Sequence, residues 1–222
     1  MATTIAHTTD LSGDDHAAFV HASGLAAASA ARLVTVHGNA PPTSSGRLPD
    51  AAPLAAAWGR PIAHERVCHE CCDDVTDTVL DALRRIQPGL VVTGTHARHG
   101  LAALVHGSVG MALARNLDVP TLVIPNRGRR FVDERTGAID LRRILIPAGN
   151  PAELAQGLAA ARTLLALAGA AAAERIVLHV GATPLLVAPE PGLRVRTATG
   201  SIARTSRPWA AASAARCARL WA

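Results

Sequence analysis

The most informative part of the chain is Val91-Val-Thr-Gly-Thr-His-Ala-Arg-His-Gly-Leu-Ala-Ala-Leu-Val-His-Gly-Ser-Val109. It starts with residues typical of a strand, continues through a loop bounded by glycines, and ends where Gly107 and Ser108 open a helix. Gly94 can turn the chain out of the strand at positive φ, and Gly107 lets the backbone approach a ligand. Ser108 can cap the helix or bind a phosphate oxygen. This order forms a backbone cradle for phosphate, so the segment predicts a nucleotide ligand.

The first 126 residues alternate strands with helices. Strands are expected at residues 4–8, 33–37, 63–69, 90–93 and 121–125, and helices at 14–31, 51–58, 75–86 and 108–116. This alternation predicts an α/β fold, with a doubly wound, Rossmann-like parallel sheet of five strands and helices on both faces. Ligands of such sheets bind beyond the carboxyl ends of the strands, where the strand order reverses. If the first strand lies beside the fourth, Asp10 and Gly94 border that position.

A resemblance to a known family rests on the same segment. Gly94, Ala97, Gly107 and Ser108 are separated by two and then nine residues. This spacing resembles the ATP-binding signature of the universal stress protein family, which has a second glycine at the position of Ala97. Alanine keeps the backbone N–H there but penalises any positive φ. The resemblance is carried further by Ile5-Ala-His-Thr-Thr-Asp-Leu-Ser12, Val34-Thr-Val-His37, Leu90-Val-Val-Thr-Gly94, Gly107-Ser-Val109 and Val119-Pro-Thr-Leu-Val-Ile-Pro125.

The resemblance covers residues 1–126 and implies an adenine nucleotide alpha hydrolase-like domain with a regulatory role in stress responses. Its ligand would be ATP or a related adenine nucleotide, with or without Mg²⁺. Asp10, beside Thr9, would bond the ribose or the adenine, unless it only caps the turn into its helix, and the backbone at His37 and Gly38 would face the base. The phosphates would be held by Gly94, Thr95, Ala97, Gly107, Ser108 and Val109, with Arg98 either meeting a phosphate or remaining a solvated arginine.

A second, shorter unit follows this domain. Residues 127–141 contain a turn at Gly137 and are expected to form a linking hairpin. Residues 142–201 repeat the order strand, helix, strand and resemble a truncated second universal stress protein domain, with Gly149 at the place of Asp10. Residues 202–222 are an atypical basic tail with four arginines and no acidic residue, and we expect it to be poorly ordered. The incomplete unit leaves a face uncovered, so we expect a homodimer through that face or the strand at 121–124.

The composition limits the possible functions. The 222 residues are 49% apolar and 18% charged, which is ordinary for a globular protein, and no stretch has the length and apolarity of a membrane span. We therefore expect a cytoplasmic protein without a membrane partner. The net charge of +5 comes from arginine alone and only 2% of the residues are aromatic, so no nucleic-acid partner is expected. The absence of lysine excludes a P-loop, a protein kinase site and Schiff-base chemistry.

The sequence also offers residues for two other kinds of chemistry. Cys68-His-Glu-Cys-Cys-Asp-Asp74 offers metal ligands, but alternate residues of a strand face opposite sides, which favours a strand end and a capped helix over a metal site. Cys71 and Cys72 stay open as a thiol-based redox sensor near a helix N-terminus. His96, His99 and His106 belong to no recognisable triad, so we predict no catalytic residues and no enzyme, with slow ATP hydrolysis left open. The remaining alternative is an interaction module that binds no nucleotide.

Overall fold

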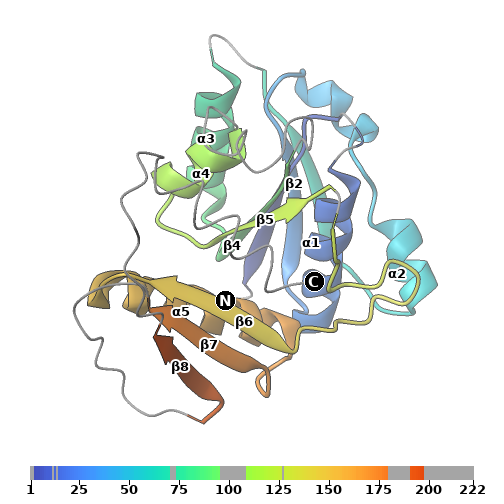
Figure 1. The fold of residues 1–222 in the computed structure, drawn as a ribbon. Helices are drawn as coiled ribbons and strands as arrows, with labels where there is room; N and C mark the ends of the chain where they lie inside the picture. Colours follow the sequence, from blue (N-terminus) through green and yellow to red (C-terminus); the bar gives the residue numbers. More distant parts are fainter. Residues whose placement is uncertain are drawn as a thin grey trace.

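The structure, a computed structural model, describes residues 3–11, 13, 15–70, 74–95, 109–126, 128–179 and 191–197. Its larger part is a sheet of five parallel strands in the order β3-β2-β1-β4-β5 (Figure 1). These strands are β1 (Thr4–Thr8), β2 (Arg32–His37), β3 (His64–Cys68), β4 (Leu90–Thr95) and β5 (Thr121–Pro125), and the helices between them are α1 (His16–Ser29), the 3-10 turn η1 (Pro42–Arg47), α2 (Ala52–Trp58), α3 (Val75–Ile86) and α4 (Val109–Asn116). The predicted doubly wound α/β fold is confirmed.

The strands are apolar on both sides because helices cover both faces of the sheet. On one face, Ile5, Leu33 and Val92 pack against α1. On the other face, the alternate residues Val34 and Val91 pack against α3 and α4, and Figure 1 shows these two helices on the side of the sheet opposite α1. The alternation follows from the two-residue period of a strand.

Local signals fix the ends of α3 as the sequence predicts. The Asp74 side chain accepts hydrogen bonds from the backbone N–H groups of Thr76 and Asp77, which satisfies donors that the first helical turn leaves unpaired. The helix ends at Gln87, which has a left-handed φ of 50°. Between these ends, α3 buries one apolar face made of Val79, Leu80, Ala82 and Leu83.

The segment after β5 forms a turn that is anchored on α1 and α2. Val132 and Ile139 make an antiparallel bridge, as expected for the predicted hairpin. The indole Nε1–H of Trp58 donates to the carbonyl oxygen of Glu134 at 2.9 Å. Gly137 has φ +66°, and a Cβ there would lie 2.6 Å from Cδ2 of Trp58. Both the turn geometry and the close packing on the indole therefore require glycine.

A second sheet contains three parallel strands in the order β6-β7-β8. Its elements are β6 (Arg143–Ala148), α5 (Pro151–Ala168), β7 (Glu174–His179) and β8 (Leu193–Thr197). The Asn150 side chain caps α5, and Gly169, with φ +63°, ends it. The strand, helix and strand predicted after residue 142 are therefore present.

Helix α5 belongs to two cores. Leu154 and Ala161 pack against Ile146 and Val177 of the second sheet. Leu167 and Ala168 belong instead to the core between α1 and the first sheet. The helix therefore joins the two sheets by direct packing.

None of the described helices combines the length and the hydropathy that a membrane span needs.

Candidate functional site

The strand order of the first sheet reverses next to β1. β1 lies between β2 and β4, so β2 and β3 extend the sheet on one side of it, and β4 and β5 on the other. Thr8, the last residue of β1, pairs with Thr93 of β4. Thr9 and Asp10 therefore reach the same edge as Gly94, and Asp10 is exposed. This edge is where ligands of open parallel sheets bind.

His37 and Gly38 lie at the same edge, at the end of β2. Nδ1 of His37 donates a hydrogen bond to the carbonyl oxygen of Thr9 at 2.8 Å, so the imidazole is buried and holds the end of β1. A Cβ on Gly38 would lie 2.6 Å from Cγ2 of Val79, which lets α3 pack closely against this turn. Because the imidazole is engaged, the backbone remains the part of this turn that a base could contact.

Gly94 does not have the turn conformation that the sequence predicts for it. It lies inside β4 and has no positive φ, so it does not turn the chain out of the strand. A Cβ on Gly94 would lie 3.0 Å from Cα and 3.1 Å from Cβ of Asp15, the residue that precedes α1. Glycine leaves room for α1 to begin against the end of β4, and a Cβ here would require Asp15 to shift by a few tenths of an ångström.

The beginning of α4 comes close to this edge as well. A Cβ on Gly110, the second residue of α4, would lie 3.0 Å from Cγ2 of Thr93. Val109 is exposed at the start of the helix, and Thr95 is half-buried at the end of β4. A helix N-terminus carries partial positive charge and unpaired N–H groups, which favour an anion.

The remaining predicted residues lie outside the described part of the chain. They are Ala97, Arg98, Gly107 and Ser108 of the loop, its histidines His96, His99 and His106, and the thiols Cys71 and Cys72. Their roles stay predictions.

Burial raises the pKa of the Cys68 thiol, which keeps it protonated. Among the residues that the structure describes, no three histidine, cysteine or acidic side chains are grouped so that they could hold a metal ion.

Comparison with known proteins identifies the family. The sequence profile of the Universal stress protein family matches residues 1–125. The chain belongs to the universal stress protein family. A solved structure described as a universal stress protein in complex with cAMP is similar at 24% identity and a TM-score of 0.47, covering 57% of this chain and 98% of that chain. The search of curated proteins finds no match.

The second sheet of this universal stress protein repeats one contact of the candidate site. Nδ1 of His179, at the end of β7, donates to the carbonyl oxygen of Ala148 at 2.9 Å. This is the same contact as that of His37 with Thr9, between the ends of the first two strands of each sheet. The residue after Ala148 is Gly149, so the second sheet has no carboxylate at the position of Asp10.

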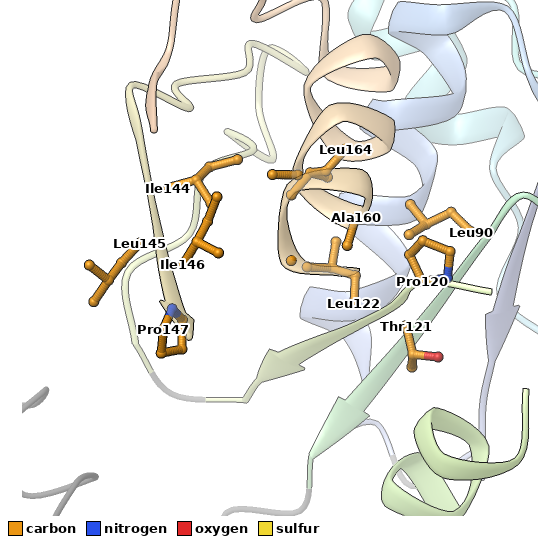
Figure 2. Close-up of a pocket in the computed structure, with 12 residues that line it drawn as sticks. Leu90, Pro120, Thr121, Leu122, Ile144, Leu145, Ile146, Pro147, Ala160 and Leu164 are labelled. Atoms are coloured by element: carbon orange, nitrogen blue, oxygen red, sulfur yellow. The ribbon is translucent and has the colours of Figure 1, made fainter. Parts of the chain in front are cut away.

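The described part of this universal stress protein also contains a cavity of about 250 Å³, which lies away from the candidate site. It lies between β5, β6 and α5, and its lining includes Leu122, Ile144 and Leu164 (Figure 2). Figure 2 shows the side chains of Ile144 and Ile146 pointing from β6 toward α5. Such an apolar lining offers little to a phosphate, which needs N–H donors or positive charge.

Two buried polar residues near the site were not predicted from the sequence. Asp15 is 7% exposed and one of its carboxylate oxygens has no hydrogen-bond partner. His7 in β1 is fully buried, and neither ring nitrogen has a partner. Its ring packs against Phe19 of α1, at 5.4 Å between centroids. In the sequence, the only signals of these two residues are that Asp15 precedes a predicted helix and that His7 lies in an apolar strand.

The buried His7 predicts that the fold loses stability in acid. Burial and then the charge of nearby His64 lower the pKa of His7 from 6.5 to about 3. Between these values the unfolded chain binds a proton that the folded chain excludes. The free energy of unfolding should therefore fall as the pH drops below 6.5, by up to about 1.4 kcal/mol per pH unit from this group. Urea unfolding at pH 4 to 8 measures this dependence.

The variant His7→Leu supplies the comparison, because leucine fills the site without a titrating nitrogen. Its free energy of unfolding should depend less steeply on pH below 6.5 and run parallel to the wild type above pH 7. Identical pH dependence of the two proteins below 6.5 would show that His7 is not the group responsible.

Proposed function

We propose that this protein binds ATP or a related adenine nucleotide at the carboxyl edge between β1 and β4, and that the bound state regulates a stress response in the cytoplasm. Membership of the universal stress protein family supports this proposal. The observation that carries it is that Asp10, just after β1, lies at the same sheet edge as Gly94 of the neighbouring β4, where the strand order reverses. The proposal assigns no catalytic residue, so binding rather than turnover is the functional event.

The proposed contacts combine the positions of the described residues at this edge with the signature spacing of the loop that follows β4. Asp10, beside Thr9, is exposed and would accept hydrogen bonds from ribose hydroxyls or the adenine amine. The backbone at His37 and Gly38 would face the base, because the imidazole of His37 is bonded to Thr9. The phosphates would lie along Gly94, Thr95, Ala97, Arg98, Gly107, Ser108 and Val109, with Mg²⁺ as their counterion.

Asp10→Ala should lower the ATP affinity by about tenfold or more, since hydrogen bonds to a charged group contribute about 1.5–3 kcal/mol. Isothermal titration calorimetry on the full chain measures this change. Asp118→Ala is the matched control, because Asp118 is exposed and precedes β5 at the opposite edge of the sheet, so it should bind like the wild type. Equal affinities for Asp10→Ala and wild type would refute the assignment. Wild-type protein that binds no adenine nucleotide would favour the interaction-module alternative.

We also propose that residues 142–201 are a truncated second unit of this family and that the chain forms a homodimer. The repeated histidine contact of His37 and His179 supports the first statement. Aligned by this contact, Leu145, Ile176 and Leu178 correspond to Ala6, Val34 and Val36, which α3 and α4 bury in the first sheet. No described helix covers the corresponding face of the second sheet. β5 offers another edge for pairing, since it is the last strand of its sheet.

Light scattering on the full chain at several concentrations should give twice the monomer mass of 22.9 kDa. Ile176→Lys should return the monomer mass if the second sheet forms the contact, and Val123→Lys should do so if β5 forms it. A wild-type protein that is monomeric at every concentration would rule out the dimer.

A further inference from the structure

The carboxylate of Asp15 is buried without full compensation. The residue is 7% exposed, and its Oδ2 atom has no hydrogen-bond partner. Its side chain does not cap α1, although Asp15 occupies the N-cap position. Among the described residues, no arginine or histidine forms an ion pair with it. A buried charge in this state is costly, so a partner of opposite charge is expected.

The position of Asp15 shows where that partner would be. Its Cα and Cβ lie 3.0 and 3.1 Å from the place of a Cβ on Gly94, the next-to-last residue of β4. The Asp15 side chain therefore leaves the backbone beside the carboxyl end of β4. Asp10, after β1, lies at the same edge. This is the edge to which the proposed function assigns the nucleotide.

A carboxylate and a phosphate at one edge repel each other unless a cation lies between them. Mg²⁺ suits this position because it binds oxygen ligands, keeps several waters, and is usually held by one or two carboxylates together with substrate phosphates. The described residues include no group of three metal-binding side chains. The described side chains alone would therefore hold the cation weakly, and the phosphates would complete its coordination.

We propose that Asp15 is a ligand of the divalent cation that joins this protein to the phosphates of its nucleotide. The inference rests on the proposed nucleotide site. It makes two statements that the site alone does not make: tight nucleotide binding requires Mg²⁺, and the requirement comes from Asp15. In the absence of the cation, the buried carboxylate opposes binding of the phosphates.

The test is ATP affinity, measured by calorimetry on the full chain with excess MgCl₂ and with EDTA. The wild type should bind at least about tenfold more weakly in EDTA. In Asp15→Asn, which keeps the size of the side chain and removes its charge, the Mg²⁺ effect should shrink to less than about threefold. This variant should also bind ATP in EDTA more tightly than the wild type does, because the repulsion is gone. Asp118→Asn, at the opposite edge, should keep the full Mg²⁺ effect.

Adenosine separates this inference from the proposed function, because it has no phosphate. It should bind the wild type and Asp15→Asn equally, with or without Mg²⁺. An unchanged Mg²⁺ effect in Asp15→Asn, or a wild type indifferent to Mg²⁺, would overturn the role of Asp15 while leaving the nucleotide site in place. A wild type that binds neither ATP nor adenosine would overturn the proposed function itself.

A measurement on the wild type avoids any dependence on the folding of the variant. Mn²⁺ added with ATP should broaden the amide NMR signals of Asp15, His16 and Gly94, since a paramagnetic ion bound to Asp15 lies close to all three. Broadening that spares these signals would also overturn the role of Asp15.

Discussion

The close approach of α1 to the end of β4 determines the geometry of the candidate site. Gly94 permits this approach, because any Cβ there would meet the backbone and side chain of Asp15. Helix α1 covers the central strands of the first sheet, where Ala18 and Leu25 pack with Ile5 and Val92. A Cβ at position 94 would require the start of α1 to shift by a few tenths of an ångström. The same contact brings the Asp15 carboxylate to the edge where Asp10 follows β1.

The second sheet depends on α5 in a similar way. A parallel sheet of three strands must bury its apolar face against another layer. Helix α5 supplies that layer through Leu154 and Ala161, while its C-terminal turn packs through Leu167 and Ala168 into the first core. The close contact of Gly157 with Ile146, where a Cβ would lie 2.6 Å from Cγ2, brings α5 near its own sheet. The second unit is thus stabilised by the first as well as by its own strands.

The sequence was sufficient to predict features that depend on local patterns. The five strands and their parallel arrangement follow from β-branched runs separated by helices, and Asp74 caps α3 as its position before an amphipathic segment indicates. Features that depend on which distant elements meet could not be predicted. The sequence favoured a turn at positive φ for Gly94, whereas the structure shows a close packing contact with α1. The hydrogen bond from His37 to Thr9 likewise depends on strand register. The roles of Ala97, Arg98, Gly107 and Ser108 remain predictions.

The nucleotide site at the edge between β1 and β4 is tested by an NMR titration of the isotope-labelled full chain with ATP and Mg²⁺, because the titration locates the ligand as well as detecting it. Amide shift changes are expected at Asp10, Gly38, Gly94 and Thr95. Gly149 serves as the internal reference, since it follows β6 as Asp10 follows β1 and should not shift. Shift changes confined to the second sheet or to the apolar cavity between β5, β6 and α5 would contradict a nucleotide site at the edge between β1 and β4.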